Sequence, residues 1–265
     1  MKSYKVREEF SELKEFTLHL PETFDRNGFV IQGNRNIVKK ITTAQGTFVI
    51  KNFKGMYFFN RLAYSIFRKS KAERSYIYSG ILNEKGISTP PHVSWIDCYK
   101  LGLLTNSYFV SVYYPYQTIK QVLDYLNIYD DTLKLSLLHH LAVFSKKLHS
   151  LGIYHDDFSV GNILVKKKLQ DYEFALVDLN RIKFHKVSYI KGLRSFTKLN
   201  IDPEDMNILI GEYARLSNEL PKSSIDLFWL YKKRSSFLRR LRKKIRHYTL
   251  KPLERLLHPK HPRVI

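Results

Sequence analysis

Apolar and polar residues alternate along much of the first half of the chain, a pattern typical of β-strands with one buried face. Two such runs, 37–41 and 47–51, flank a turn at 44–46 and predict a β-hairpin. Three further strand-like runs follow, at residues 93–96, 101–104 and 108–114. Residues 1–27 are mixed in character. The pattern therefore predicts a β-rich unit in the first half.

Helical spacing occurs in one segment of this first half and dominates the second half. Residues 57–82 carry apolar side chains at spacings of one, three and four, and Gly86 follows as a stop signal. A long amphipathic stretch covers residues 131–151. The chain has 265 residues, which suits one two-lobed unit or two modest domains. We expect an α+β protein with a β-rich lobe over residues 1–114 and a mainly helical lobe over residues 115–265.

A short stretch rich in acidic and amide side chains follows the long amphipathic segment. His155, Asp157 and Asn162 have the spacing H-x-D-x-x-x-x-N of a kinase catalytic loop. A second apolar run ends on Asp178, where the metal-binding Asp of such enzymes follows its strand. An ordinary turn is the alternative interpretation, since Asp-Asp and Gly-Asn pairs are common in turns. The second acid after an apolar strand favours the kinase loop.

The chemistry of phosphoryl transfer explains this spacing. The reaction needs in-line positioning and compensation of charge on the phosphate oxygens. Magnesium prefers oxygen ligands and keeps several waters, so one or two carboxylates and an amide oxygen suffice. We therefore take Asp157 and His155 as the candidate catalytic residues, with Asp157 accepting or orienting the proton of the acceptor hydroxyl. Asn162 and Asp178 are the candidate magnesium ligands and help to bind ATP.

Candidate nucleotide-binding residues lie in the first half of the chain. Lys51 closes a run similar to the V-A-I-K strand of kinases, although a lysine that closes a strand is usually just solvated. An ion pair with Glu73, in the helix predicted next, would hold Lys51 against the phosphates of ATP. Glu84 is the second candidate partner. Gly33 would lie in the phosphate-covering loop, and a plain β-turn explains this position equally well.

Charge and composition restrict the partners. The net charge of +21 and the pI near 9.8 favour an anionic partner, which leaves nucleic acid, an anionic membrane surface and an acidic substrate. The single cysteine, Cys98, excludes an internal disulfide and mildly favours a reducing compartment. The sequence shows no signal-peptide pattern, and no apolar run approaches the ~20 residues that cross a bilayer. We expect a cytoplasmic protein whose membrane contact is peripheral.

The C-terminal tail is strongly basic. Residues 232–247 contain nine Lys or Arg and no acid, and Leu238, Leu241, Ile245 and Tyr248 fall on one face of a helix. Such a helix, within the segment 232–265, suits an anionic membrane surface, at ~1 kcal/mol per Lys or Arg near it. Nucleic-acid binding and a solvated helix with a packed apolar stripe are the alternatives. We favour the membrane and expect no nucleic acid.

Taken together, the lysine strand, the acidic helix, the catalytic loop and Asp178 resemble the protein-kinase-like fold. The chain resembles the lipopolysaccharide core kinases, the Kdo/heptose kinase family, still more closely. The likeness lies in the basic helix at 59–74, the segment 82–90, the compact catalytic loop and the basic tail. It covers roughly residues 30–250.

This resemblance implies a bilobal fold, ATP and Mg²⁺ as cofactors, and transfer of phosphate to a Kdo or heptose hydroxyl of the lipopolysaccharide inner core. The acceptor would be an anionic glycolipid of the lipid A type at the cytoplasmic face of the inner membrane. The absence of an A-P-E motif after residues 181–200 also favours a small-molecule or lipid-type acceptor.

The sequence also departs from the kinase pattern. Residues 178–180 read D-L-N in place of D-F-G, and Asp156 replaces the usual Arg or Gly. Two alternatives therefore stay open. One is another small-molecule kinase of the aminoglycoside-phosphotransferase type, and the other is a pseudokinase or a basic membrane- or nucleic-acid-binding scaffold.

Overall fold

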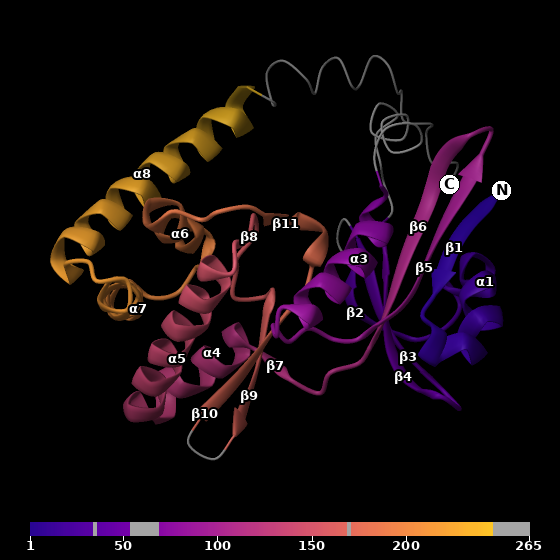
Figure 1. Cartoon of the computed structure of the whole chain (residues 1–265), viewed down its shortest axis with the longest axis horizontal. Helices are drawn as coiled ribbons and strands as arrows, with labels where there is room; N and C mark the ends of the chain where they lie inside the picture. Colours follow the sequence, from indigo (N-terminus) through magenta and orange to yellow (C-terminus); the bar gives the residue numbers. More distant parts are fainter. Residues whose placement is uncertain (34–35, 54–68, 169–170, 246–265) are drawn as a thin grey trace, which may run out of the picture.

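The computed structural model describes residues 1–33, 36–53, 69–168 and 171–245 of the chain. Figure 1 shows a β-rich part formed by the N-terminal residues and a mainly helical part formed by the C-terminal residues. The predicted α+β class, with a β-rich N-terminal region and a helical C-terminal region, is confirmed. The division at residue 114 falls in the connection between strands β6 (Leu103–Val112) and β7 (Gln117–Thr118) and stays a prediction.

The N-terminal part is built on one six-stranded sheet in which every neighbouring pair is antiparallel. The strand order is β1-β5-β6-β4-β3-β2, and the hairpin β3–β4 confirms the one predicted from the sequence. The strands are β1 (Lys2–Val6), β2 (Phe29–Gly33), β3 (Ile37–Thr43), β4 (Gly46–Asn52), β5 (His92–Lys100) and β6 (Leu103–Val112).

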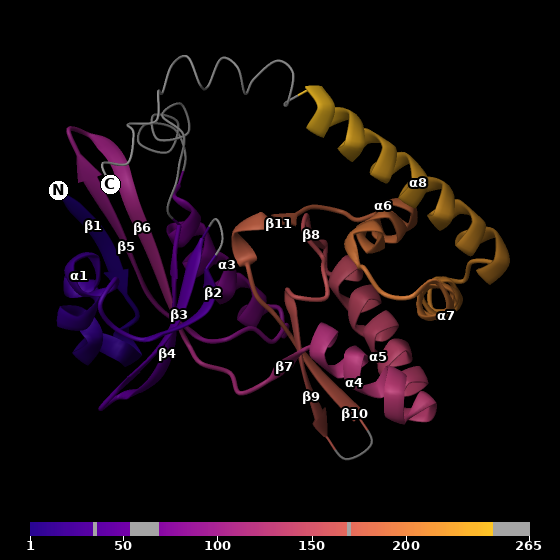
Figure 2. The ribbon, with the colours of Figure 1, turned by 180° about the vertical axis from the view of Figure 1, so that it is seen from behind.

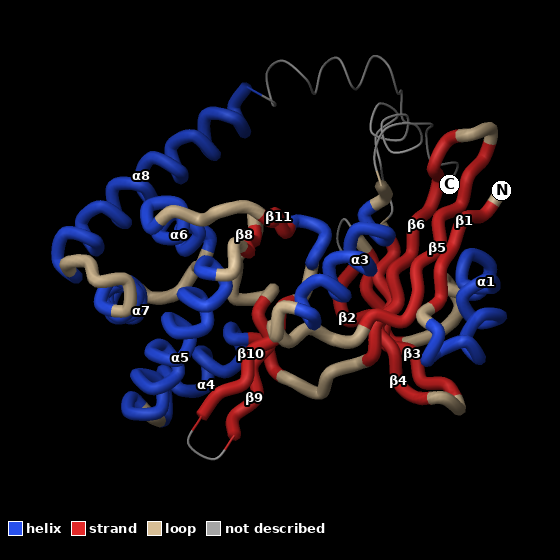
Figure 3. The backbone as a smooth tube through the Cα atoms, in the orientation of Figure 1, coloured by secondary structure: helices blue, strands red, loops and turns tan. Residues whose placement is uncertain are grey.

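Two helices pack on this sheet through separate apolar clusters. Helix α1 (Lys14–Thr23) follows the 3-10 helix η1 (Glu8–Leu13), and its Leu20 packs with Phe48 and Ile96 of the sheet. Helix α3 (Lys71–Glu84) contributes Tyr76 to a cluster with Trp95. Because neighbouring residues of a strand point to opposite faces, Trp95 and Ile96 place these helices on opposite faces of β5. Figure 3 shows the sheet between them.

Three expectations about the N-terminal part are either corrected by the structure or tested over only some of their residues. Residues 1–27, which were mixed in sequence, form β1, η1 and α1. The run 101–104 is not a strand from its start, because Leu101 and Gly102 have positive φ and form the turn before β6. The helix predicted at 57–82 is present from Lys71, where the side chain of Ser70 accepts a hydrogen bond from Glu73 N–H. Its first part, 57–68, lies outside the described residues.

The C-terminal part has one large apolar core surrounded by helices and short strands. The long amphipathic segment forms α5, whose start is capped by Asp130, which accepts a hydrogen bond from Leu133 N–H at 2.8 Å. The C-terminal part also contains a three-stranded sheet and a two-stranded sheet. The elements are α4 (Ile119–Tyr129), α5 (Asp131–Ser150), α6 (Tyr189–Ser195), α7 (Pro203–Arg215), β7 (Gln117–Thr118), β8 (Ile153–His155), β9 (Ile163–Lys168), β10 (Asp171–Leu176), β11 (Ile182–Phe184), η2 (Leu179–Arg181) and η3 (Phe196–Lys198).

Helix α8 (Pro221–Ile245) begins well before the basic tail in which the sequence predicts a helix. The segment 227–231 and the described part of the basic tail form one continuous helix. Its first half packs against the body through Phe228, and its second half runs past the other helices, as Figures 1 and 2 show. None of the described helices has the length and apolar character needed to span a membrane.

Candidate active site

The catalytic loop begins at His155, which is buried at the end of β8 and uses both ring nitrogens locally. Nδ1 accepts a hydrogen bond from Asp157 N–H at 3.0 Å, and Nε2 lies 3.2 Å from the carbonyl oxygen of Val177. A carbonyl only accepts, so Nε2 carries the proton and the ring is neutral. Burial lowers the pKa of His155, which favours the same neutral form. His155 therefore fixes the loop to the residue before Asp178.

Asn162 closes the other end of the loop. Its side-chain nitrogen donates to the Asp157 carbonyl oxygen at 2.9 Å, and its backbone oxygen accepts from Val177 N–H at 3.0 Å. Because the amide nitrogen is bound to the loop, the amide oxygen is the atom that can bind a cation. These bonds hold Asn162 beside Asp157 and next to the turn that carries Asp178.

Asp178 follows β10 in the left-handed backbone conformation, with φ 59° and ψ 44°. This conformation is uncommon for residues other than glycine, and such residues cluster at functional sites. The Asp178 carboxylate forms an ion pair with Lys51 of β4, and both side chains are only 16% exposed. Its Oδ1 also accepts a hydrogen bond from the Asn180 side chain at 2.6 Å. Asp178 and Lys51 thus join the helical part to the β-rich part.

The predicted ion pair between Lys51 and Glu73 is not the pairing in the structure. Glu73 forms an ion pair at 2.6 Å with Lys69, four residues earlier in the chain, whereas Lys51 pairs with Asp178. Lys69 is so close to Glu73 in sequence that their pairing costs little chain entropy. The turn at Asp178 places a carboxylate beside Lys51. Glu84, the second predicted partner, is exposed at the far end of α3. A role of Glu73 in nucleotide binding stays a prediction.

Gly33 lies at the end of β2, opposite Ile37 of β3. A Cβ atom added there would lie 3.6 Å from Val30 Cγ1, which is an ordinary contact. The backbone at this position therefore does not require glycine. Residues 34–35 of the predicted phosphate-covering loop lie outside the described residues, so the role of Gly33 stays a prediction.

Arg181 is a site residue that sequence reasoning missed. Its Nη1 lies 3.6 Å from Asp157 Oδ2, and its Nε lies 3.9 Å from Asp178 Oδ2. The guanidinium therefore lies between the candidate base and the candidate metal ligand. A basic residue three positions after Asp178 was visible in the sequence. Its return toward Asp157 depends on the pairing of β11 with β8, which the sequence does not reveal.

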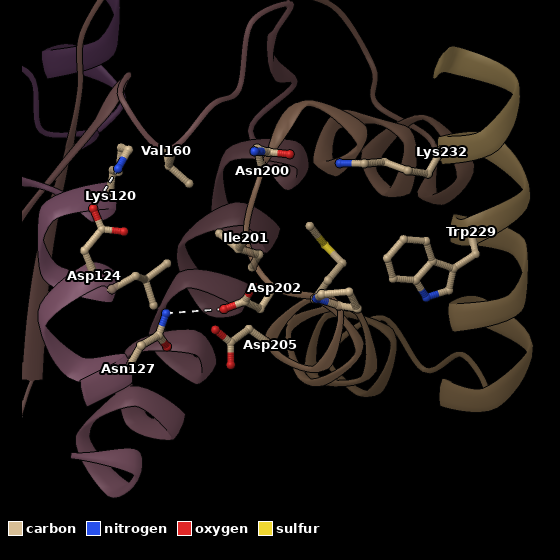
Figure 4. Close-up of a pocket in the computed structure, with 13 residues that line it drawn as sticks. Lys120, Asp124, Asn127, Val160, Asn200, Ile201, Asp202, Asp205, Trp229 and Lys232 are labelled. Atoms are coloured by element: carbon tan, nitrogen blue, oxygen red, sulfur yellow. Dashed lines mark hydrogen bonds and ion pairs between the residues drawn. The ribbon is translucent and has the colours of Figure 1, made fainter. Parts of the chain in front are cut away.

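Two cavities border the catalytic loop. The smaller, of about 390 Å³, has Asp156 and Asp178 in its wall. The larger, of about 520 Å³, has Val160 in its wall and lies between α4, the start of α7 and α8, as Figure 4 shows. Asp178 lines the smaller cavity and is absent from the wall of the larger one, so the candidate metal ligand belongs to the smaller cavity.

The larger cavity has walls of mixed polarity. Lys120 pairs with Asp124 at 2.7 Å on α4, and the Asn127 side chain lies 3.4 Å from Asp202 across the cavity floor. Trp229 of α8 faces these groups in Figure 4, with its ring nitrogen donating to the Asn207 side chain at 2.8 Å. Helix α8 therefore forms one wall of a cavity that reaches the catalytic loop.

Comparison with known proteins shows which family the segment containing this site resembles. The model of the lipopolysaccharide kinase (Kdo/WaaP) family matches residues 67–191, which contain the catalytic loop and Asp178. The predicted resemblance to the lipopolysaccharide kinases is confirmed. The match of this segment to a lipopolysaccharide kinase family supports phosphotransferase activity on lipopolysaccharide, and such kinases use ATP with Mg²⁺.

A solved structure has a fold similar to that of this chain. The chain is similar to a protein described as WaaP in complex with acyl carrier protein, with a TM-score of 0.61 and 14% identity. The similarity covers 89% of this chain and 99% of that chain. At this identity the likeness concerns the fold alone, and it confirms the predicted kinase-like fold. No curated protein matches the chain closely enough for comparison.

Proposed function

We propose that this protein is an ATP-dependent kinase that phosphorylates a Kdo or heptose hydroxyl of the lipopolysaccharide inner core. The observation that carries the proposal is the meeting of Lys51, Asp178 and the H-x-D-x-x-x-x-N loop at one place, although Lys51 and Asp178 are 127 positions apart. The family match to residues 67–191 supports the acceptor class. The particular sugar is taken from the predicted resemblance.

The residues at this site fit magnesium and the phosphates of ATP. Asp178 offers a carboxylate and Asn162 an amide oxygen, which are hard oxygen ligands of the kind that Mg²⁺ prefers. No group of three or more His, Cys, Asp or Glu capable of holding a metal occurs in the described part of the chain. A site of one carboxylate, one amide oxygen and phosphate oxygens agrees with this donor set. When bound, the metal supplies charge neutralisation on the phosphate oxygens.

The protein's own residues have separable roles in this reaction. Asp157 is the proton acceptor for the acceptor hydroxyl, and His155 holds the Asp157 backbone in place through the bond at 3.0 Å. Lys51, which β4 places beside Asp178, is the cation that binds the phosphates of ATP. A neutral, buried His155 with both nitrogens engaged positions the loop and does not itself exchange protons. We therefore assign His155 a positioning role rather than a catalytic one.

The second half of α8 supports a peripheral location at the anionic inner membrane. The described residues 232–245 contain eight Lys or Arg, and Phe237, Leu241 and Ile245 are exposed. A helix with this composition binds anionic headgroups while its apolar side chains enter the interface. Flotation with phosphatidylglycerol vesicles tests this location. Loss of flotation in a chain shortened after residue 231 supports it, and unchanged flotation contradicts it.

The function is tested by transfer of labelled γ-phosphate from ATP to Kdo–lipid A, with wild type and Asp178→Ala side by side. We expect label in the glycolipid with wild type and none with the variant. Label on soluble aminoglycosides alone would replace the lipopolysaccharide acceptor with a small molecule. Magnesium-dependent ATP binding without transfer to any acceptor would indicate a pseudokinase.

A further inference from the structure

The smaller cavity beside the catalytic loop has a predominantly cationic wall. Asp156 and Asp178 are its only acidic lining residues within the described part of the chain, so the basic residues outnumber the acidic ones four to two. The basic side chains come from α3, η2 and β11, and they are Lys71, Arg74, Arg181 and Lys183. Tyr78, Asn36 and Asn180 add polar groups that can donate hydrogen bonds. This composition fits an anionic ligand better than a neutral one.

The pairing of β11 with β8 explains how one side of this wall forms. Ile182 lies opposite His155 and is buried, so the alternation of the strand sends Lys183 to the other face. Arg181 is the last residue of η2, directly before β11. The side chains of Arg181 and Lys183 are 47% and 57% exposed, and both are directed at acids of the catalytic loop. Lys183 pairs with Asp156 at 2.6 Å.

Helix α3 forms the opposite side of the wall. Lys71 and Arg74 are three positions apart in its first turn, which places them on one face of the helix. Tyr78 follows four positions after Arg74 on the same face. The positive end of the α3 dipole lies at this turn and adds to the attraction for an anion.

Arg181 is only loosely paired with the neighbouring acids. Charge-assisted hydrogen bonds have donor–acceptor distances of about 2.7–2.9 Å. Arg181 lies 3.6 Å from Asp157 and 3.9 Å from Asp178, so it is near both carboxylates without bonding closely to either. A planar guanidinium in this arrangement can turn toward a carboxylate or phosphate and bind it with two parallel hydrogen bonds.

The cavity is separate from the residues assigned to the ATP phosphates. Of Lys51, Asn162 and Asp178, only Asp178 lines it. The cavity instead includes Asp156, the neighbour of Asp157, which is the residue that faces the acceptor hydroxyl in the proposed mechanism. An anion bound here therefore lies next to the acceptor side of the reaction.

We propose that this cavity binds an anionic substituent of the acceptor, a carboxylate or a phosphate, close to the hydroxyl that is phosphorylated. The inference rests on the proposed kinase function and adds the means by which the acceptor is recognised. The acceptor's negative charge is recognised by Lys183, Arg74 and Lys71. Arg181 lies between this charge and the carboxylates of Asp157 and Asp178. Neutral sugars of the same shape are poor acceptors.

The first test is steady-state transfer to Kdo–lipid A with Lys183→Gln and Arg74→Gln, one variant from each side of the cavity. We expect the KM for the glycolipid to rise about tenfold in each, since a hydrogen bond to a charged group contributes roughly 1.5–3 kcal/mol. The KM for ATP should change less than twofold, and Lys183→Arg should restore most of the acceptor affinity. Lys167→Gln, an exposed lysine of β9 outside the cavity, is the matched control.

Modified acceptors identify the source of the anion. One arm uses Kdo–lipid A with its carboxyl groups methyl-esterified, and the other uses Kdo–lipid A with its phosphates removed. We expect one of the two modified acceptors to have a KM about tenfold higher than that of the intact acceptor with wild type, and the same KM with Lys183→Gln. The group that was altered in this acceptor is the group that the cavity binds. Equal KM values for both modified acceptors and the intact one would overturn the proposal.

Two further outcomes separate this inference from the proposed function. A rise in the KM for ATP without a change for the acceptor would assign the cavity to the nucleotide and overturn the inference. If wild type transfers no phosphate, binding of Kdo–lipid A micelles still tests the cavity. Weaker binding by Lys183→Gln than by Lys167→Gln supports the cavity while the kinase function fails, and equal binding overturns the cavity as well.

Discussion

Replacement of His155 by alanine removes the side chain that links the catalytic loop to the residue before Asp178. Two hydrogen bonds are lost, each contributing about 1 kcal/mol, and Asp157 N–H and the Val177 carbonyl oxygen lose a partner in a partly buried region. We expect the free energy of unfolding to fall by about 2–4 kcal/mol, to be measured by urea denaturation. His19→Ala, at an exposed position of α1, should change it by less than about 0.5 kcal/mol.

The kinetic effect of the same substitution follows from geometry. A displacement of a reacting group by about 1 Å can lower the rate about a hundredfold, so kcat should fall by about that factor. The KM for ATP should change much less, because Lys51 and Asp178 keep their ion pair. His155→Gln offers both a donor and an acceptor and should restore much of kcat.

The pH dependence of kcat distinguishes positioning from proton transfer. Burial lowers the pKa of His155, so above its ordinary value near 6.5 the ring stays neutral and contributes no change. The kcat profiles of wild type and His155→Gln should therefore have the same shape between pH 6.5 and 9. A limb of the wild-type profile that disappears in the variant would refute the positioning role.

Three further predictions concern the metal ligand, packing and stability. Asn162→Ala should raise the Mg²⁺ concentration for half-maximal activity about tenfold, because an amide ligand beside Asp157 is lost, and a magnesium titration checks this. Gly192→Ala should lower the free energy of unfolding by at least about 1–3 kcal/mol, because the new Cβ collides with Tyr213 Oη and lies 2.8 Å from His149 Nδ1; urea denaturation measures the loss. Burial lowers the pKa of His149 to about 4, so its neutral form contributes stability above pH 6.5 that is lost as pH falls toward 4. The loss should amount to about 3 kcal/mol relative to His149→Gln, and equal acid sensitivity of the two chains would contradict it.

The catalytic loop could be predicted because its chemistry requires particular residue types at fixed spacing. The structure brings Asp157, Asn162 and Asp178 together through local hydrogen bonds and through the position of Arg181. The partner of Lys51 could not be predicted in the same way. It depends on how two distant segments meet, and the left-handed turn at Asp178 is not visible in the pattern of apolar residues.

The N-terminal elements were missed for a different reason. Strand β1 pairs with β5 at the edge of the sheet, yet four of its five residues are exposed, so its sequence carries little alternation. Its stability comes from backbone hydrogen bonds that any residue except proline can donate. By contrast, β4 buries Phe48 and Ile50 in the core, and its alternation predicted the strand correctly.

The basic tail illustrates what composition can and cannot show. Charge and spacing predicted a helix, and the described residues of α8 confirm it up to Ile245. The continuity of this helix with the segment around Phe228 depends on packing against the core, which fixes the direction in which the basic half leaves the body. The composition of the tail does not indicate the direction of this helix.

The most direct test of the account is single-turnover phosphate transfer to Kdo–lipid A by wild type, Asp157→Asn and Asp171→Asn. Asp171 is an exposed acid at the start of β10 and serves as the matched control. We expect Asp157→Asn to retain ATP binding and to slow transfer by about 10²–10⁴-fold, while Asp171→Asn keeps the wild-type rate. Transfer by Asp157→Asn at the wild-type rate would contradict the assignment of the catalytic loop.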